Sequence, residues 1–339
     1  MAFKMKENHG DVKNLHMILA GDIGGTKTLL GMFDPDPARP RPVTVRAFGT
    51  LDYRDLTAMI VEFTSDAALR SISIDAACFG VAGPVIGDAA ALTNVPWKVE
   101  AREIAHRFGF ARVDLLNDLQ AMAYGVTVLQ ASEVHVLQAG DSRNDGNIGL
   151  LAAGTGLGEA LLHNVGGRLI PSASEGGHAD FAARNEREIR LLRRLIVTHG
   201  RAQVEDVVSG PGLRRIHEIT HTGACRGVED LESPDAPAAI SAAALERRCD
   251  GCVEALEMFV EAYGAEAGNL ALRVVATGGL FVGGGIAPKI LPAMSDGRFM
   301  RAFREKAPLE TLLAAMPVKV ILNAQTGLLG AAVFAASRA

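Results

Sequence analysis

Runs of apolar residues broken by glycine or proline set the pattern of the first third of the chain. Residues 16–34 form an apolar run, a glycine turn and a second apolar run, which predicts a β-hairpin. Further strands are expected at 43–53, 72–83, 89–97 and 113–118, and helices at 55–71, at 99–109 and from 119 onward. Strands that alternate with helices in this way predict a layered α/β fold.

The strand, glycine turn and strand pattern returns at residues 147–164, which suggests a weak internal duplication. Residues 185–272 are predicted to be mainly helical, and strands at 273–287 and 318–323 precede a last helix at 326–337. We therefore expect two α/β lobes with a cleft between them. The expected bounds are a flexible tail at 1–14, a small α/β domain at 15–128 plus 323–339, and a large α/β domain at 129–322.

The composition of the chain excludes several classes of protein. Of its 339 residues, 48% are hydrophobic and 22% are charged, so a sizeable core can form and intrinsic disorder is excluded. The net charge of -5 comes without a long basic block, which argues against a nucleic-acid partner. No apolar run reaches the roughly 20 residues of a membrane-spanning helix, and none near the N-terminus resembles a signal sequence. We expect a cytoplasmic protein that does not enter a membrane.

The four cysteines are too few for a disulfide framework in a chain of this length. Cys249 and Cys252 form a CxxC pair, but a zinc site would need a second pair of ligands nearby. Residues 244–264 read as one amphipathic helix. We therefore interpret the two cysteines as ordinary positions of that helix.

Gly21 to Thr28, GDIGGTKT, nearly fits the phosphate-loop spacing GxxxxGK[ST]. The fit fails because Thr26 replaces the second glycine and the following segment is strand-like. A tight glycine turn remains, whose backbone N–H groups can bind an anion. Asp22 could face a magnesium ion, most simply through water, and Thr26 and Lys27 could contact phosphate oxygens. A plain hairpin turn with a solvated Asp22 is the alternative.

A second glycine turn, AAGTGLGEA, contains Gly154, Thr155 and Gly156. Its glycine spacing and the strand that follows it do not fit a dinucleotide-binding fold, so a second phosphate turn is favoured over a plain hairpin. A third glycine segment, Gly283 to Gly285, joins a strand to a helix expected to begin near Pro288. These glycines leave room for a flat ring on the backbone, and simple close packing explains them equally well.

Two polar pairs complete the candidate chemistry. Asn117 and Asp118 stand where a strand ends and a helix begins, a position typical of helix caps and also of the crevice where open α/β sheets bind ligands. Asp118 is our candidate general base. Glu175 and His178, in SEGGHADF, could bind a metal, cap a helix or hydrogen-bond sugar hydroxyls. Without a further His or Cys cluster nearby, we prefer a polar sugar site to zinc.

Taken together, these residues resemble the bacterial glucokinase family, within the superfamily of sugar kinases, actin and heat-shock ATPases. The likeness runs from about Leu19 to Gly330 and rests on GDIGGT, TNVPW, LLNDLQA, GTGLGEA, EGGHADF, EDVVSGPGL and GGGIAP, in the family's order. The resemblance implies a two-domain, actin-like (ribonuclease H-like) α/β sugar kinase fold with an interdomain cleft. It also implies ATP-dependent phosphorylation of the 6-hydroxyl of glucose.

The resemblance further assigns roles to residues of this chain. Asp118 would accept the hydroxyl proton, while other polar side chains hold the remaining sugar hydroxyls: Asn117, Glu175, His178 and Glu205, with Asn94 close by. Two turns would grip the ATP phosphates: Gly21, Asp22, Ile23, Gly24, Gly25, Thr26 and Lys27 in the first, and Gly154, Thr155 and Gly156 in the second. Gly284 and Gly285 would lie by the adenosine. Mg²⁺ would bridge the phosphates near Asp22, and we expect a homodimer.

Two further hypotheses remain. Lys27 stands where the close glucokinase group usually has asparagine, and lysine is typical of a neighbouring family of repressors and kinases, whose zinc cysteine motif is absent here. A kinase for another hexose or an amino sugar, such as mannose or N-acetylmannosamine, would use the same fold. A sugar-sensing regulator would need a helix-turn-helix ahead of the first strand, for which the residues before His16 are too few.

Overall fold

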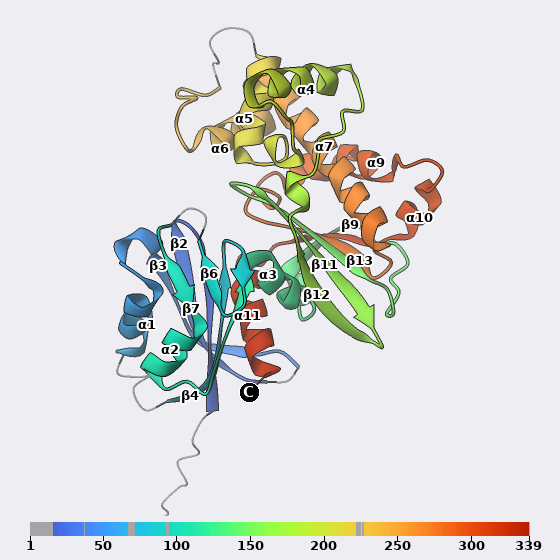
Figure 1. Cartoon of the computed structure of the whole chain (residues 1–339). Helices are drawn as coiled ribbons and strands as arrows, with labels where there is room; N and C mark the ends of the chain where they lie inside the picture. Colours follow the sequence, from blue (N-terminus) through green and yellow to red (C-terminus); the bar gives the residue numbers. More distant parts are fainter. Residues whose placement is uncertain are drawn as a thin grey trace, which may run out of the picture. The chain divides into compact units, whose positions relative to one another are not determined.

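The computed structural model describes residues 16–36, 38–66, 72–92, 95–221, 225 and 227–338. The chain divides into two compact units (Figure 1): unit 1 comprises Met1–Asp118 with Ala331–Ala339, and unit 2 comprises Leu119–Gly330. Each unit combines a sheet with helices, so the mixed α/β class predicted from the sequence is confirmed. Within the described ranges, no helix combines the length and the apolar character that a membrane span requires.

Unit 1 is built on a five-stranded sheet with the strand order β3-β2-β1-β4-β8. Strands β1, β2 and β3 pair antiparallel, whereas β1, β4 and β8 run parallel, and a small sheet of β5, β6 and β7 lies outside this order. The predicted hairpin is confirmed as β1 and β2. The elements of unit 1 are β1 (His16–Ile23), β2 (Lys27–Asp34), β3 (Arg41–Gly49), η1 (Thr50–Asp52), α1 (Leu56–Thr64), β4 (Ser73–Val81), β5 (Val85–Ile86), β6 (Ala89–Ala91), β7 (Lys98–Glu100), α2 (Ala101–Phe108) and β8 (Arg112–Asn117).

Unit 2 contains a six-stranded sheet with the order β12-β11-β10-β13-β14-β9. Its elements are α3 (Asp118–Val126), η2 (Ala131–Glu133), β9 (Val134–Gln138), β10 (Ile148–Ala153), β11 (Leu157–Val165), β12 (Arg168–Ser174), η3 (Gly176–His178), α4 (Glu186–His199), η4 (Val204–Asp206), α5 (Gly210–Thr220), α6 (Ala236–Leu245), α7 (Asp250–Val274), β13 (Gly279–Gly283), α8 (Leu291–Met294), α9 (Arg298–Arg304), α10 (Glu310–Ala315), β14 (Val318–Ile321) and α11 (Thr326–Ala336). Helices α3 and α11 each cross from one unit to the other.

The two sheets share one plan. In each, a three-stranded antiparallel meander (β1-β2-β3 or β10-β11-β12) continues from its first strand into parallel strands, β4 and β8 in unit 1 and β13 and β14 in unit 2. The internal duplication predicted from the repeated strand, turn and strand pattern is therefore confirmed at the level of strand order. Each meander places a glycine turn after its first strand.

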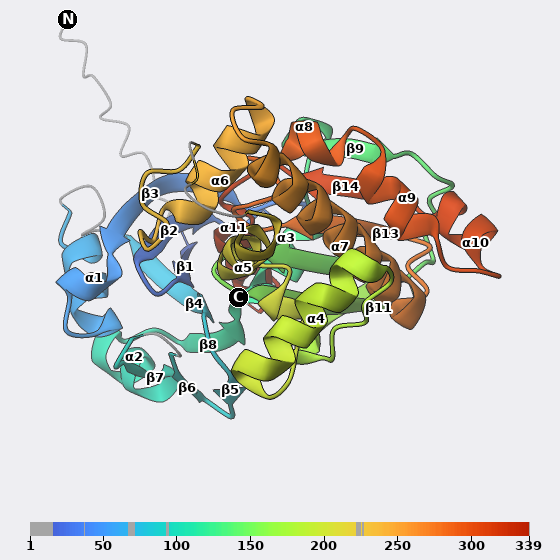
Figure 2. The ribbon, with the colours of Figure 1, turned by 90° about the horizontal axis from the view of Figure 1, so that it is seen from above.

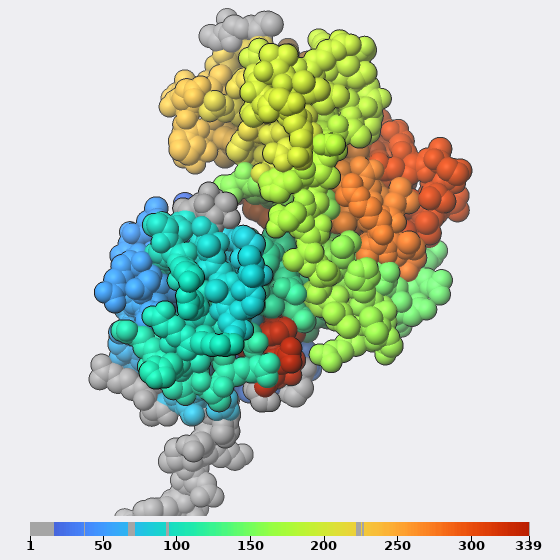
Figure 3. Space-filling view, in the orientation of Figure 1, coloured from blue at the N-terminus to red at the C-terminus, as the bar shows by residue number. Residues whose placement is uncertain are grey.

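Helix α7 is the centre of unit 2. It packs against β10 and β13 and is flanked by α5, α6 and α9 (Figure 2). Its buried residues join the core that Leu151, Leu213 and Phe299 also build. In the space-filling view, α4 to α6, coloured yellow-green to gold, form the outer surface at one end of unit 2 (Figure 3). The mainly helical character predicted for 185–272 is confirmed.

Two predicted helix bounds are wrong. Residues 244–264 do not form one helix: α6 ends at Leu245, Arg247 adopts a left-handed φ of 54°, and Cys249 is the extended N-cap of α7. A left-handed residue breaks the i to i−4 hydrogen-bond ladder, so the chain changes direction here. The helix expected near Pro288 begins instead at Leu291, and Pro288 lies in the turn that precedes it.

Candidate active site

The first glycine turn is held rigidly in unit 1. Gly24 N donates to Lys27 O (3.1 Å), and a Cβ added at Gly24 would lie 2.8 Å from that oxygen. The Thr50 hydroxyl donates to Gly24 O (2.8 Å), and Thr50 N donates to Thr26 O (3.0 Å). Thr26 and Lys27 are exposed, while Gly25 is partly buried. The turn therefore offers an exposed hydroxyl and an exposed positive charge on a backbone that hydrogen bonds hold in place.

The strand before this turn contributes chiefly backbone. The Ile23 side chain is fully buried in the core of unit 1. A Cβ added at Gly21 would lie 2.5 Å from the Phe79 ring, so this glycine serves the packing of β1 on β4. Of the three β1 residues predicted to face ATP, only Asp22 has a polar side chain, and this side chain is partly buried.

Asp22, Asn117 and Asp118 meet at one edge of the unit 1 sheet. The carboxyl ends of parallel strands lie at the same edge of a sheet. Strands β1, β4 and β8 are parallel, and Asp22 and Asn117 lie at the carboxyl ends of β1 and β8. Asn117 Nδ2 donates to Gly83 O (3.3 Å), and Asp118 begins α3. Burial, and then the charge of Asp118, raise the pKa of Asp22 to about 6, against the opposing effect of Lys27. The two carboxylates therefore lie close enough to repel each other, a pairing that a cation would stabilise.

The second glycine turn lies in unit 2, between β10 and β11. Gly154 N donates to Gly156 O (2.8 Å), and Gly210 N, at the start of α5, donates to Gly154 O (2.8 Å). Thr155 is exposed, and no atom lies within 4 Å of a Cβ added at Gly154. The turn is therefore open on the side that a side chain at position 154 would occupy.

The third glycine segment packs beside the second. Ile286 N donates to Ala153 O (3.3 Å), and a Cβ added at Gly284 would lie only 2.2 Å from the same oxygen. Gly284 also has a φ of +83°, which L side chains rarely adopt. Gly285, in contrast, is exposed and has nothing within 4 Å of an added Cβ. Of the two glycines predicted to face adenosine, Gly284 allows the backbone to pack closely against Ala153, and Gly285 leaves open space where a side chain would stand.

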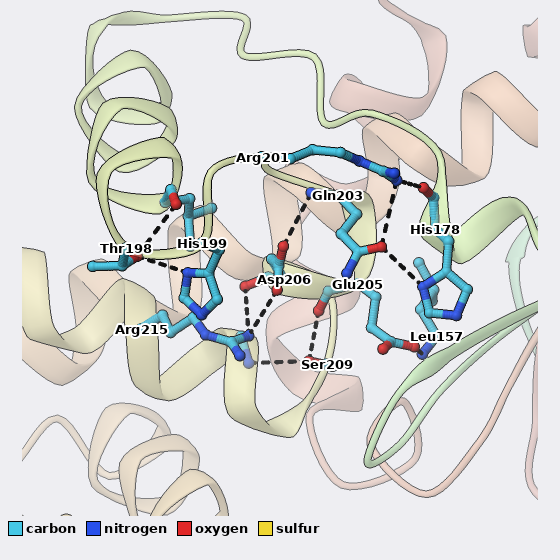
Figure 4. A network of polar contacts seen from close by, with 12 residues as sticks. Leu157, His178, Thr198, His199, Arg201, Gln203, Glu205, Asp206, Ser209 and Arg215 are labelled. Atoms are coloured by element: carbon cyan, nitrogen blue, oxygen red, sulfur yellow. Dashed lines mark hydrogen bonds and ion pairs between the residues drawn. The ribbon is translucent and has the colours of Figure 1, made fainter. Parts of the chain in front are cut away.

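Glu175 is the N-cap of η3 and His178 is its last residue, and η3 packs on the start of β11. A Cβ added at Gly177 would lie 2.0 Å from Leu157 O, so the loop can approach β11 only because glycine stands there. His178 Nδ1 is 3.0 Å from Gln203 Oε1 (Figure 4). His178 Nε2 is 3.9 Å from Glu175 Oε2. The side chains of Glu175 and His178 are 76% and 52% exposed, so both can reach a ligand.

Glu205 connects this loop region to the second glycine turn. Glu205 Oε2 accepts a hydrogen bond from Leu157 N (2.7 Å; Figure 4). A Cβ added at Gly156 would lie 2.5 Å from that carboxylate oxygen. Ser209, the N-cap of α5, donates its hydroxyl to Glu205 O (2.7 Å). Glu205 therefore fixes the position at which β11 begins. Its other carboxylate oxygen accepts no hydrogen bond from the part of the chain that the structure describes.

Three residues beside the predicted site residues were not predicted from the sequence: Thr50 in unit 1, and Gln203 and Glu159 in unit 2. Gln203 orients His178 and is itself held by a capping box with Asp206, whose Q-x-x-D spacing is a readable signal. Arg201, next to it, donates to the carbonyl oxygen of His178. Thr50 had no sequence signal, because its partner turn lies 26 residues away along the chain at Gly24.

Glu159 is a buried acid beneath the η3 loop. Glu159 is only 1% exposed. A Cβ added at Gly176 would lie 2.0 Å from Glu159 Oε2. Arg273 Nη1 lies 3.4 Å from Glu159 Oε2 and 2.8 Å from Glu266 Oε1, and Glu159 Oε1 has no hydrogen-bond partner among the described residues. Burial and the neighbouring Glu266 raise the pKa of Glu159 to about 8. A lone charged residue in an otherwise apolar strand was the signal that could have identified it.

The raised pKa of Glu159 predicts that the free energy of unfolding falls as the pH rises from about 5 to about 8. Across that window folded Glu159 keeps a proton that the unfolded chain has lost, so each pH unit costs up to about 1.4 kcal/mol. Glu159→Gln is expected to flatten this dependence. Urea unfolding at several pH values measures it, and Glu175→Gln, which removes an exposed carboxylate from the adjacent loop, should keep the wild-type slope. Equal slopes for wild type and Glu159→Gln would contradict the prediction.

The predicted site residues thus form one group in each unit. Unit 1 brings together the first glycine turn, Asp22, Asn117 and Asp118. Unit 2 brings together Glu205 and the second and third glycine segments, and places Glu175 and His178 on the loop beside β11. Asn94 lies outside the described residues.

Comparison with known proteins identifies relatives along almost the whole chain. A family model described as Glucokinase matches residues 19–338. A glucokinase of Synechocystis sp. is 41% identical, over 94% of this chain and 97% of its own length. A crystal structure of glucokinase from an Antarctic psychrotroph has a TM-score of 0.83 at 29% identity, covering 95% of this chain and 99% of that one. A ROK family glucokinase from Streptomyces griseus, in complex with glucose and AMPPNP, shares the fold, with a TM-score of 0.64 at 20% identity over 95% and 99% of the two chains.

These neighbours confirm the two-domain, actin-like sugar kinase class that the sequence motifs implied. The family match covers both glycine turns, the acids at the edge of the unit 1 sheet and the loop that carries Glu175 and His178. The chain belongs to the glucokinase family.

Proposed function

We propose that this chain transfers the γ-phosphoryl group of ATP to the 6-hydroxyl of glucose, with Asp118 as the general base. The observation that supports the base assignment is the placement of Asp118 directly after β8, at the same sheet edge as Asp22. The 6-hydroxyl gives its proton to a carboxylate oxygen of Asp118, a bond forms between O6 and the γ-phosphorus, and the bond from that phosphorus to the β-phosphate breaks. The products are glucose 6-phosphate and ADP.

Backbone and charge carry most of this chemistry. Phosphoryl transfer needs chiefly positioning and charge neutralisation. The exposed Thr26 and Lys27 of the first turn suit phosphate oxygens, and the open space at Gly154, beside the exposed Thr155, leaves room for a phosphate to approach the second turn. Gly285 leaves room for the nucleoside.

Mg²⁺ is part of the proposal. The fit rests on Asp22, a hard oxygen donor whose pKa is raised to about 6 by burial and by the charge of Asp118. A nearby cation would favour the ionised form of Asp22. When bound, Mg²⁺ neutralises phosphate charge, and Asp22 would hold its hydration shell through water.

Polar side chains of unit 2 suit the other sugar hydroxyls. Each hydroxyl that leaves water needs a hydrogen-bond partner. Glu175 and His178 are exposed enough to provide partners, and Gln203 orients the His178 ring. Glu205 has one carboxylate oxygen beyond the hydrogen bond to Leu157. Asn117 and Asn94 complete the proposed set.

A homodimer and a cytoplasmic location also remain proposals.

A hexose panel in a coupled ADP assay tests the substrate assignment. We expect the highest kcat/KM for glucose, no ADP release without sugar beyond slow hydrolysis, and glucose 6-phosphate as the product by phosphorus NMR. Mannose and N-acetylmannosamine are the informative competitors, because the same fold accepts many sugars. A higher kcat/KM for either of them would replace glucose as the substrate, and sugar-independent ADP release would refute the kinase assignment.

A further inference from the structure

Unit 2 contains a thiol–imidazole cluster that the proposed kinase chemistry does not use. Its members are His217, His221, Cys225, Cys249 and Cys252. The ligand atoms of Cys225, Cys249 and Cys252 lie within 4.8 Å of one another, and so do those of His217, His221 and Cys225. Cys225 therefore belongs to both groups and stands at the centre of the cluster.

Two sequence pairs, distant along the chain, meet in this cluster. His221 is the C-cap of α5, and Cys225 follows four residues later. Cys249 is the N-cap of α7, and Cys252 lies in the first turn of that helix. The spacing C-x₂-C is that of structural zinc sites, and three residues separate His221 from Cys225, a separation within the range that such sites use between paired ligands. The second ligand pair that the sequence interpretation required nearby is therefore present, 24 residues ahead of Cys249, and the interpretation of the cysteines as ordinary helix positions is revised.

The distances between the sulfurs fit a shared metal ion. Cys225 Sγ lies 3.7 Å from Cys249 Sγ and 3.6 Å from Cys252 Sγ. Four ligands at a Zn–S distance of about 2.3 Å in a tetrahedron place neighbouring sulfurs roughly 3.8 Å apart. A disulfide needs about 2.05 Å, and all three cysteines are free thiols. The thiols are therefore spaced as zinc ligands and not as bonded partners.

The two imidazoles of the cluster make few polar contacts with the rest of the described residues. His217 is 1% exposed, and its ring stacks on that of His221 with 5.0 Å between centroids. Among the described residues, neither nitrogen of His217 nor Nδ1 of His221 has a hydrogen-bond partner. Glycine at position 251 allows the close approach, since a Cβ there would lie 2.6 Å from His221 Cδ2. Buried polar nitrogens without partners are rare, and a bound metal ion would give His221 the partner that its Nδ1 atom lacks.

We propose that Cys225, Cys249, Cys252 and His221 bind one structural zinc ion. Three thiolates and one imidazole are a zinc donor set, whereas magnesium and calcium prefer oxygen. Four protein ligands close the coordination sphere, so the ion has a structural role and no open position for catalysis. The three thiols release their protons to solvent as they bind. His217 packs behind His221 and orients it.

The ion would fasten α5 to α7 at the end of α5 remote from the proposed ATP site. The opposite end of α5 begins at Gly210, whose N–H donates to Gly154 O (2.8 Å) in the second glycine turn. Zinc is therefore expected to stabilise unit 2, the unit that carries this turn. This inference does not depend on the substrate, because it concerns metal content and stability.

Metal analysis of the full-length protein tests the proposal directly. The protein is purified under reducing conditions and dialysed against zinc-free buffer, and its zinc is measured by inductively coupled plasma mass spectrometry. We expect one zinc ion per chain. Cobalt(II) substituted for zinc should give the intense visible bands of tetrahedral coordination and thiolate-to-cobalt charge transfer. Reduced wild-type protein that binds zinc more weakly than about 1 μM, or that shows octahedral cobalt, would overturn the proposal.

Variants assign the ligands. Cys225→Ser is expected to weaken zinc binding by at least about 100-fold, because removal of a direct ligand exceeds the 10- to 100-fold effect of outer partners. His221→Ala should also lose tetrahedral cobalt absorbance, while His217→Ala should keep it. Cys78→Ala, which removes the buried cysteine of unit 1, is the matched control and should keep full zinc content. Should Cys225→Ser keep the wild-type zinc content, the cluster is not the site. Wild-type metal content and cobalt spectra decide the matter even if a variant fails to fold.

Discussion

Asp118→Asn is expected to lower kcat for glucose phosphorylation by about 100-fold or more, the range for loss of a general base. An amide cannot accept the proton of the 6-hydroxyl, whereas its size and polarity keep the start of α3 intact. The KM values for glucose and ATP should change far less than kcat, because the residues that hold both substrates remain. Steady-state kinetics in a coupled ADP assay, with circular dichroism to verify folding, measure the effect.

Asp114→Asn is the matched control for that substitution. Asp114 lies in β8, the strand that ends just before Asp118, and its carboxylate pairs with Arg112 at 3.0 Å. Its loss therefore removes an equal charge away from the proposed base. The control should keep a kcat close to that of wild type. If folded Asp118→Asn released ADP from glucose at a near-normal rate, the assignment of Asp118 as the base would be wrong.

Gly284→Ala is expected to destabilise the protein by at least about 2 kcal/mol, combining the strain of a left-handed backbone with overpacking. The added Cβ would lie 2.2 Å from Ala153 O, and the backbone of both residues is fixed by the sheet they continue. Since Ala153 directly precedes the second glycine turn, the affinity for ATP should fall as well. Urea unfolding and the KM for ATP measure the two effects.

Gly285→Ala separates packing from binding at this segment. Gly285 has open space around an added Cβ, so the free energy of unfolding should stay within about 0.5 kcal/mol of wild type. The KM for ATP should still rise, because the methyl group enters the space proposed for the nucleoside. Unchanged KM in Gly285→Ala would contradict the placement of adenosine, and unchanged stability in Gly284→Ala would contradict the packing argument.

Local pattern was sufficient to predict most of the fold. The glycine turns at Gly24 and Gly154 interrupt apolar runs within a few residues, and the hairpins they predict are β1 with β2 and β10 with β11. Recurrence of that pattern indicated the duplication, which the shared strand order confirms. Asp118 could be predicted as a candidate because the end of a strand and the start of a helix are both readable locally.

Contacts between distant segments could not be predicted in the same way. The sulfurs of Cys225 and Cys252 are neighbours across 27 positions of chain, and the CxxC pair alone does not reveal its partners. The break at Arg247 depends on a single left-handed residue that no composition rule indicates.

The glycines carry a similar lesson. Sequence motifs suggested ligand contact for several glycines, but at Gly176 and Gly177, between Glu175 and His178, the absent side chain makes room for Glu159 and for Leu157 O. Only the structure separates glycines that admit a neighbour from glycines that leave open space, such as Gly154 and Gly285.

Helix α11 also bears on how the protein is made. From Ala331 onward this helix belongs to unit 1, although the rest of unit 1 ends at Asp118. Ala331, Ala332 and Ala335 are fully buried. During synthesis from the N-terminus, unit 1 must therefore wait for more than 200 further residues before its last helix leaves the ribosome. Unit 2 can form most of its core during that wait, so the unit translated first is the one completed last.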